Sequence, residues 1–145
     1  MKSDNFEFKL VEDFASADFV FDAYADTLEN LFIACATACF TAMTDPRLVE
    51  PKLKYDISVS GENLNELLYN YIAELIYLKD TEKIFLSSFE VRISEDRQSL
   101  YSVVKGEAID YNKHVIKTDV KAVTYHALEI KKHDGGFMTR MVLDL

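Results

Sequence analysis

The stretch from Leu28 to Met43 reads LENLFIACATACFTAM, and its period is the clearest indication of the fold. Apolar side chains recur there at intervals of three and four residues, which places them along one face of a helix. Asp26 suits the N-cap, with Glu29 three residues later in a variant of the capping box. Pro46 follows the stretch and is expected to end the helix, because its ring cannot continue the hydrogen-bond pattern. The apolar face consists of Leu28, Leu31, Phe32, Cys35, Ala36, Cys39, Phe40 and Met43.

A second stretch with the same period runs from Leu64 to Ile76 and predicts a second amphipathic helix. Much of the remaining chain alternates apolar and polar residues, which is typical of strands with one buried face. Strands are predicted over residues 6–10, 19–23, 53–59, 84–93, 100–109, 120–130 and 137–143. The last two are expected to form a hairpin across residues 133–136, and residues 111–118 are expected to be a loop.

Runs of strands around two helices predict an α+β fold and not the regular alternation of a β/α protein. We expect a single domain over residues 1–145, with two amphipathic helices packed on one face of an antiparallel or mixed sheet. A chain of this length buries about 68–70% of its unfolded surface, so it needs neither a disulfide nor a structural metal to fold. Cys35 and Cys39 lie on the apolar face of the first helix, and we expect them to pack in the core as small apolar groups.

The chain is acidic, with 25 Asp and Glu residues against 16 Lys and Arg and a formal net charge of −9. Affinity for nucleic acid comes mostly from cationic side chains that neutralise phosphates, so strong direct binding of nucleic acid is not expected. A basic protein partner or a metal cation suits this charge better, although the same charge also serves solubility. No apolar run approaches the roughly 18 residues of a membrane span, and the N-terminus lacks an apolar signal core, so we expect a cytoplasmic protein without a membrane partner.

Short motifs with a known catalytic chemistry do not occur in the sequence. The three histidines, His114, His126 and His133, are scattered and lack the paired spacing of a zinc site. The sequence also lacks a phosphate-binding glycine loop and a nucleophile elbow. Nothing in the spacing therefore proposes a nucleophile and a base.

The acidic residues offer one candidate site. Asp18 lies just before a short predicted strand, while Asp144 and the α-carboxylate of Leu145 lie at the other end of the chain. If the last strand runs beside the first, these oxygens converge, and hard cations such as Ca²⁺ or Mg²⁺ take such ligands. The alternative is that these carboxylates simply lie in water, as most acidic side chains do.

Several segments resemble the archease family, in collinear order over nearly the whole chain. The strongest match is VKAVTYH at residues 120–126, which agrees with a family strand almost letter for letter, and the ending MVLDL at residues 141–145 has the family's aspartate before one aliphatic residue. SAD at residues 16–18 matches the end of the family's DHTAD segment, although Phe14 and Ala15 replace its leading Asp-His. Further family-like positions are Tyr24, Thr27, Leu28, Glu29, Leu67, Leu68, Tyr69, Glu74, Leu75, Gly106, Glu107 and His114, whereas Val20 and Ala25 stand where the family usually has glycine.

The resemblance implies a domain of the strand-helix-strand-strand type and a non-enzymatic role. Archeases are accessory proteins of the RtcB-type RNA ligase, which joins tRNA halves during splicing and RNA repair, and they promote its guanylylation and multiple turnover. The family's metal site carries over to Asp18, Asp144 and Leu145, with Ca²⁺ or Mg²⁺ as the expected ion, and Lys121 and His126 are candidate contacts to the partner. Two alternatives stay open: a chaperone or adaptor module that serves another protein, and a small metal-dependent hydrolase that uses the same carboxylates.

Overall fold

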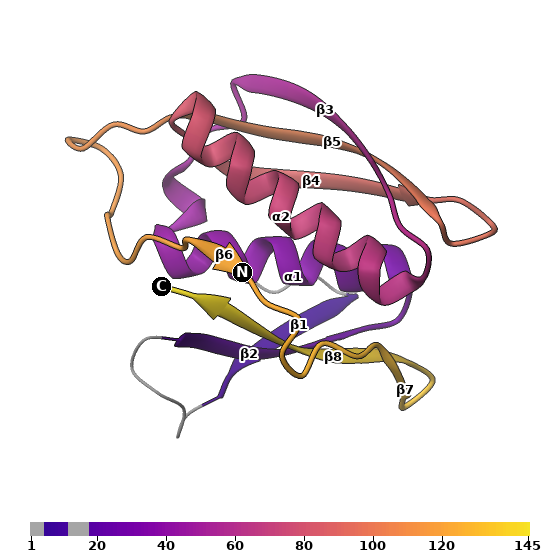
Figure 1. Ribbon diagram of the computed structural model, residues 1–145. Coiled ribbons are helices and arrows are strands. Elements are labelled where there is room, and N and C mark those ends of the chain that lie inside the picture. The colour runs from indigo at the N-terminus through magenta and orange to yellow at the C-terminus, as the bar shows by residue number, and fades with distance from the viewer. Residues whose placement is uncertain (1–4, 12–17) are drawn as a thin grey trace.

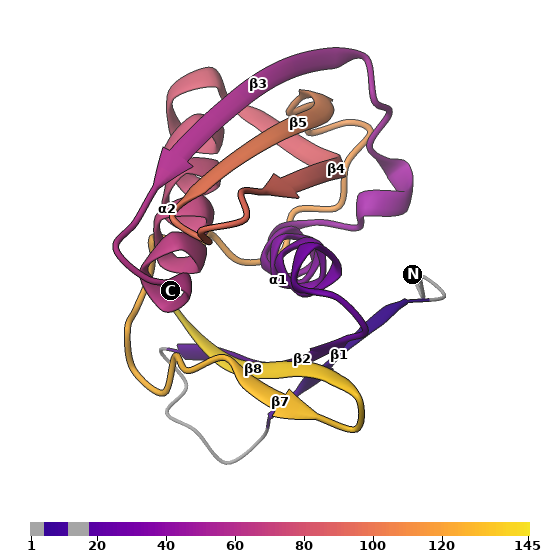
Figure 2. The same ribbon diagram turned by 90° about the vertical axis from the view of Figure 1, so that its right-hand side faces the viewer.

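Two antiparallel sheets face each other across helix α1 (Leu28–Met43), as Figure 1 and Figure 2 show. The computed structural model describes residues 5–11 and 18–145. In the larger sheet the order is β1-β2-β8-β6, with β7 also paired to β8; its strands are β1 (Phe6–Leu10), β2 (Asp18–Ala25), β6 (Ala122–Val123), β7 (Lys131–His133) and β8 (Gly136–Asp144). In the smaller sheet the order is β3-β5-β4; its strands are β3 (Leu53–Ser60), β4 (Ile84–Ile93) and β5 (Ser99–Ala108).

The α+β class expected from the sequence is confirmed, with two helices packed on antiparallel sheets. Within the described residues the strands form two sheets and not one, because β2 pairs with the last strand of the chain while β3, β4 and β5 pair among themselves. Helix α1 contacts both sheets, and α2 (Leu64–Glu82) packs on the smaller sheet and on β6. Residues 14–17, of which Ser16 and Ala17 match the family segment and Phe14 and Ala15 depart from it, lie outside the described residues.

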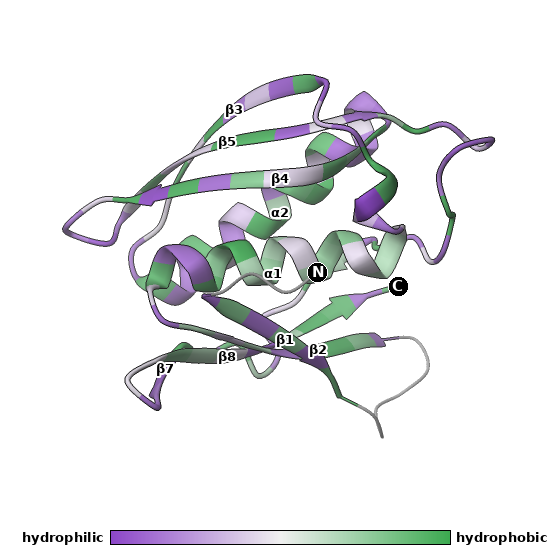
Figure 3. Cartoon of the chain, turned by 180° about the vertical axis from the view of Figure 1, so that it is seen from behind, coloured by the Kyte–Doolittle hydropathy of each residue, from purple (hydrophilic) through white to green (hydrophobic). Residues whose placement is uncertain are grey.

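Helix α1 is buried on most of its surface because a sheet covers it from either side (Figure 2). Its predicted apolar face is buried, and so are Ala34, Ala38 and Ala42 outside that face. Figure 3 shows the helix as largely hydrophobic between two sheets of mixed hydropathy. Cys35 and Cys39 are fully buried free thiols, as predicted, and burial raises the pKa of the Cys39 thiol to about 12. Both cysteines therefore act as apolar core groups.

The N-cap of α1 is Thr27, so the prediction of Asp26 as the cap was wrong by one residue. The Thr27 hydroxyl accepts a hydrogen bond from the Asn30 backbone N–H at 3.1 Å, while the Asp26 carboxylate accepts one from the Asn30 side-chain amide at 2.8 Å. Both residue types are good N-caps, so the choice depends on the backbone path into the helix. Beyond the other end of α1, Pro46 begins a separate 3-10 turn (Pro46–Leu48), consistent with its expected role as a terminator.

Helix α2 carries the predicted apolar face and continues beyond the predicted end to Glu82. The Asn63 side chain caps its first turn by accepting a hydrogen bond from the Glu66 N–H at 2.9 Å. Lys83 ends the helix in the left-handed conformation, with φ of 55°. Neither helix of the described chain is long and apolar enough to cross a membrane. The buried face of α2 consists of Leu67, Leu68, Tyr71, Ile72, Leu75 and Ile76, joined by Lys79.

The strand predicted over residues 120–130 was wrong for most of its length, because β6 contains only Ala122 and Val123. The chain leaves β8 after Thr124, whose N–H still donates to the Val142 carbonyl at 3.1 Å, and then turns, with the Leu128 N–H bonded to the Tyr125 carbonyl at 3.1 Å. Ala127 has a φ of 60° within this turn, a value that no strand residue adopts. Local alternation of apolar residues therefore did not produce a strand there.

The predicted hairpin turn at residues 133–136 is present, but β7 supplies its first strand. His133 pairs with Gly136, and the two-residue loop between them consists of Asp134 and Gly135. Their φ values of 47° and 80° are both positive, as the preferred two-residue hairpin turn requires. The Asp-Gly pair thus determines this turn locally.

Gly106 of β5 lies too close to the backbone of β4 for a side chain to fit. It lies between β3 and β4, and a Cβ at this position would meet the Phe85 carbonyl oxygen at 1.9 Å. We expect Gly106→Ala to lower the free energy of unfolding by about 2 kcal/mol or more, because neighbouring backbone must move to relieve the overlap. Urea unfolding followed by circular dichroism measures the change.

Gly135→Asn provides the matched control, because nothing lies within 4 Å of a Cβ at Gly135 and asparagine tolerates a positive φ. This substitution is expected to cost less than about 1 kcal/mol. A Gly106→Ala protein that unfolds at the same urea concentration as the wild type would show that the close approach at Gly106 is not a constraint.

Candidate functional site

Asp18 and Asp144 stand directly opposite each other at one end of the β2–β8 pair. The two strands are antiparallel, so the first residue of β2 meets the last residue of β8. Figure 1 shows both strands running side by side below α1, with the C-terminus at the end of β8. The structure therefore brings together two of the predicted site residues from opposite ends of the chain.

Both carboxylates point away from α1, on the outer face of the larger sheet. Phe21 of β2 and Met141 of β8 are register partners, and both are completely buried in the core. Successive side chains along a strand point to opposite faces, which places Asp18 and Asp144 on the other side from these core residues. The site is thus on the surface of a sheet whose inner face is fixed by the core.

Asp18 and Asp144 are two acidic residues in direct cross-strand register. Cross-strand partners have Cβ atoms about 4.5–5.5 Å apart, and like charges in that position destabilise a sheet. Within residues 5–11 and 18–145, neither Asp18 nor Asp144 has a side-chain hydrogen bond or ion pair. The next pair on the same face, Val20 and Val142, is buried, so solvent screens the carboxylates less on that side. Two unpaired carboxylates in this arrangement fit a cation bound between them.

Leu145 directly follows Asp144, the last residue of β8. In the part of the chain that the structure describes, no group of three or more His, Cys, Asp or Glu side chains could hold a metal ion. A cation here would need oxygen ligands beyond the two aspartates. An all-oxygen set suits Ca²⁺ or Mg²⁺ and not Zn²⁺, which prefers nitrogen and sulfur.

Of the two candidate partner contacts, Lys121 lies beside this pair and His126 lies farther along the sheet. The Lys121 N–H donates to the Asp144 carbonyl at 2.8 Å, and Ala122 is the register partner of Asp144. His126 lies in the turn after β6, where its N–H donates to the Thr124 hydroxyl at 3.2 Å. Both side chains are exposed. Lys121 therefore shares the end of the sheet with the carboxylates, and His126 does not.

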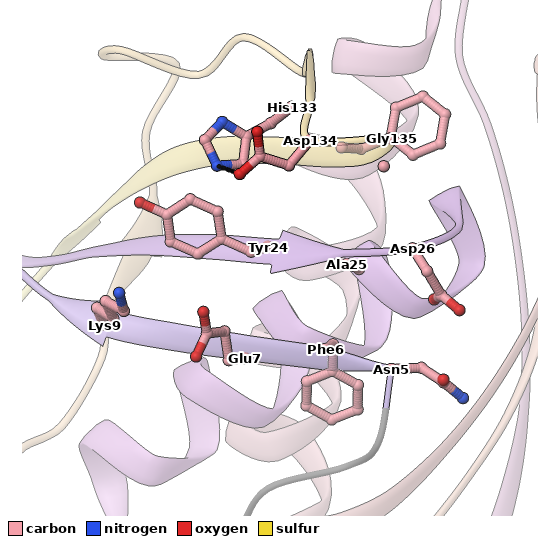
Figure 4. A pocket seen from close by; sticks show the side chains of 12 residues that line it. Asn5, Phe6, Glu7, Lys9, Tyr24, Ala25, Asp26, His133, Asp134 and Gly135 are labelled. Atoms are coloured by element: carbon pink, nitrogen blue, oxygen red, sulfur yellow. Dashed lines mark ion pairs between the residues drawn. The ribbon is translucent and has the colours of Figure 1, made fainter.

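A hollow of about 600 Å³ lies on the outer face of the same sheet, toward the other end of β2 (Figure 4). Tyr24 lines it, with the His133 ring 5.1 Å from its own ring and the Lys9 ammonium 5.6 Å from its centroid. His133 also pairs with Asp134 at 3.4 Å. Tyr24 is roughly 20 Å along β2 from Asp18 at the usual rise of a strand. The hollow is therefore separate from the carboxylate pair, and its mixed charges select no class of ligand.

A second polar cluster, centred on Glu107 of β5, was not predicted from the sequence as a cluster. One oxygen of Glu107 accepts hydrogen bonds from the Glu50 N–H at 2.8 Å, Lys113 Nζ at 2.8 Å and His114 Nε2 at 2.9 Å. His114 Nδ1 accepts from the Asp110 N–H at 3.0 Å, which leaves the ring proton on Nε2 for Glu107. These partners lie up to 57 residues from Glu107, so no local spacing signals them.

The Glu107 cluster anchors the segment that follows β5. The hydrogen bond from Glu50 N–H and the contact with Lys113 lower the pKa of Glu107 to about 2. Three donors converge on one Glu107 oxygen, and two of them, Lys113 Nζ and His114 Nε2, belong to the segment after β5. The arrangement is therefore structural, and it ties His114 and its loop to the smaller sheet.

Comparison with known proteins identifies relatives over most of the chain. A profile described as the Archease protein family matches residues 8–145. "Protein archease" of Pyrococcus furiosus is 39% identical over 133 residues, which cover 90% of this chain and 94% of that protein. The solution structure of Methanobacterium thermoautotrophicum protein 1598 has a TM-score of 0.81 and 38% identity, and the match covers 97% of this chain and 99% of the other. A crystal structure from Thermotoga maritima, described as "an archease, possible chaperone", shares the fold at a TM-score of 0.65 and 14% identity over 90% of this chain and 93% of the other.

The low pKa of Glu107 gives a pH dependence of stability. A carboxyl whose pKa falls from an ordinary value of 4.5 to about 2 on folding stabilises the folded protein above pH 4.5, and this contribution disappears as the pH falls toward 2. We expect Glu107→Gln to lower the free energy of unfolding at pH 7 by about 1–3 kcal/mol, because an amide replaces a charged acceptor. The difference from the wild type should shrink between pH 4.5 and pH 2, as measured by urea unfolding at a series of pH values.

Glu129→Gln is the control, because Glu129 is exposed and its one ion pair, with Lys131, is 3.9 Å long. Such a pair contributes little to stability at any pH. A difference between Glu107→Gln and the wild type that stays constant down to pH 2 would contradict a role for the Glu107 charge.

Proposed function

Because this chain belongs to the archease family, we propose that it is a non-enzymatic accessory protein of an RtcB-type RNA ligase. In this role the protein binds the ligase, promotes its guanylylation and permits repeated turnover in tRNA splicing or RNA repair. The proposed site holds a divalent cation, Ca²⁺ or Mg²⁺, between Asp18, Asp144 and the α-carboxylate of Leu145.

The single observation that carries this proposal is the register of Asp18 with Asp144. These residues lie far apart in the sequence, yet the β2–β8 pairing makes them direct partners on the outer face of the larger sheet, where Asp144 is exposed and Asp18 is partly exposed. Sheet pairing holds both backbones at this end, since Asp18 pairs with Asp144 and Asp144 also pairs with Ala122 of β6. Such a scaffold supports a site whose geometry has to match a partner's active site.

Each residue at the proposed site would have its own role, either as a ligand of the cation or as a contact to the partner. Asp18 and Asp144 supply two charged oxygen ligands, and Leu145 supplies a third. When bound, a divalent cation supplies a compact positive charge that neutralises the carboxylates and attracts further oxygen ligands. Lys121, whose backbone bonds to Asp144, adds an exposed ammonium beside the site that can contact an anionic group of the partner. His126 is the second proposed contact, farther along the surface.

The acidic charge of the protein supports a ligase as the partner. An enzyme that binds RNA presents cationic surface to the phosphate backbone. A protein with a net charge of −9 is attracted to such a surface, and the attraction increases the association rate. Binding of the two proteins should therefore weaken as the salt concentration rises.

Cation binding is expected to raise the thermal stability of the wild type and not of Asp18→Asn or Asp144→Asn. A ligand at 100 times its Kd stabilises the folded state by about 2.7 kcal/mol, and each substitution removes one charged ligand. In chelator, both variants are expected to be at least as stable as the wild type, because they remove the repulsion between opposed like charges. Thermal unfolding in Ca²⁺, in Mg²⁺ and in chelator measures both effects.

Two further variants make this test specific. Asp134→Asn is the matched control, because its side chain is exposed in the β7–β8 turn and asparagine tolerates its φ of 47°. A one-residue extension after Leu145 converts the α-carboxylate into an amide and should abolish cation binding, whereas an N-terminal extension should not. Equal stabilisation by cation of the wild type, Asp18→Asn and the C-terminally extended protein would contradict the site.

In a ligation assay with RNA in excess, the wild-type protein is expected to raise the number of turnovers by a purified RtcB-type ligase from the same source. Asp18→Asn should lose most of this effect, and Asp134→Asn should keep it. An unchanged turnover number in the presence of the wild type would refute the proposed function. Capture of other proteins without a ligase would then favour the adaptor role, and cation-dependent hydrolysis of a generic phosphoester by the protein alone would favour the hydrolase.

A further inference from the structure

Lys79 of α2 is a cationic side chain held inside the fold. Its side chain is only 5% exposed, and its Nζ lies 2.6 Å from the Asp80 carboxylate and 2.7 Å from the Asp119 carboxylate. Nζ also donates to the Val120 carbonyl at 3.3 Å. A buried ammonium needs such partners, because an unpaired charge in the interior is costly. The two carboxylates differ in place: Asp80 is the next residue of α2, whereas Asp119 comes 40 residues later in the chain.

The segment held by Lys79 leads directly to the C-terminal carboxylates. Val120 is completely buried in the core, and the following N–H, that of Lys121, donates to the Asp144 carbonyl at 2.8 Å. A continuous set of contacts therefore joins the Lys79 ammonium, through residues 119–121, to the main chain of Asp144. Figure 1 shows the same path, with β6 lying between α2 and the end of β8.

We propose that Lys79 is a positioning residue for the cation site. By holding Asp119 and the Val120 carbonyl, it fixes β6 against β8 and so sets the direction of the Asp144 carboxylate toward Asp18. This role presupposes the cation site proposed above and extends it to a residue that touches neither the ion nor its ligands.

The need for such an anchor follows from the length of β6. A strand of two residues forms few ladder hydrogen bonds, and β6 is also the edge strand of the larger sheet. Strand ends next to a chain terminus fray unless something ties them down. Asp144 is the last residue of β8, with β2 on one side and β6 on the other. Helix α2 is fixed by its buried face, so Lys79 supplies a rigid attachment from outside the sheet.

Comparing a substitution of Asp80 with one of Asp119 separates the positioning role of Lys79 from the effect of removing one negative charge near the site. Asp80 and Asp119 bind the same nitrogen at nearly the same distance, and both carboxylates are at least half exposed. Replacing either with asparagine therefore removes one negative charge from the same small region. Only Asp119 lies on the segment that leads to Asp144, so only its replacement should disturb the site.

The test compares Asp119→Asn and Asp80→Asn with the wild type in calorimetric titrations with Ca²⁺ at physiological salt. We expect Asp119→Asn to bind Ca²⁺ about tenfold more weakly, in line with the loss of a residue that orients metal ligands, and Asp80→Asn to bind like the wild type. Amide hydrogen exchange without cation gives a second readout. The Lys121 N–H should exchange faster in Asp119→Asn and at the wild-type rate in Asp80→Asn, while the free energy of global unfolding stays close to that of the wild type in both.

Lys79→Met is the third variant, because it removes the ammonium that pairs with both Asp80 and Asp119. If this variant folds, it should show the weakened Ca²⁺ binding of Asp119→Asn. Wild-type binding by Asp119→Asn, or equal weakening in Asp119→Asn and Asp80→Asn, would overturn the positioning role and leave the cation site intact. Absence of saturable Ca²⁺ and Mg²⁺ binding by the wild type would overturn the cation site itself and the positioning role with it.

Discussion

The antiparallel pairing of β2 with β8 is the constraint on which the rest of this structure depends. It joins two segments that lie near opposite ends of the chain, as the 2.8 Å ion pair between Asp22 and Arg140, 118 residues apart, illustrates. The entropy lost in closing a chain loop grows only slowly with its length, so burial of the inner face of these strands can offset it. Phe21 and Met141 form part of that buried face. The same pairing sets Asp18 opposite its partner at the end of β8, so the core and the candidate site share one cause.

Helix α1 and the inner faces of the two sheets form the apolar interior. The outer face of the larger sheet carries acidic side chains at its end, beside the buried pair Val20 and Val142. A pair of aspartates on an outer face interrupts no core packing. Its cost is the repulsion of like charges, which a bound cation would remove. The fold can therefore hold an acidic site of this kind without weakening its interior.

Polar contacts hold both ends of the irregular segment between β5 and β6 in place. Near its start, Glu107 holds His114 and Lys113 against the smaller sheet. Near its end, Lys79 holds Asp119 beside α2. Backbone and side-chain bonds from Lys117 to the C-terminal turn of α1 support it between these points. The segment has little regular structure of its own, so these long-range contacts determine where β6 meets β8.

The local elements of this protein follow from the order of its residues. The period of residues 28–43 predicted α1, alternation predicted most strands, and the Asp-Gly pair at residues 134–135 predicted the hairpin turn. Resemblance to a family selected Asp18 and Asp144 as site residues. Long-range contacts were needed to show that the strands form two sheets, that residues 125–130 turn away from β8, and that Lys79 reaches a carboxylate 40 residues later. Helical and strand periods arise from neighbours a few residues apart, whereas pairing and buried charge depend on contacts between segments that meet only when the whole chain is folded.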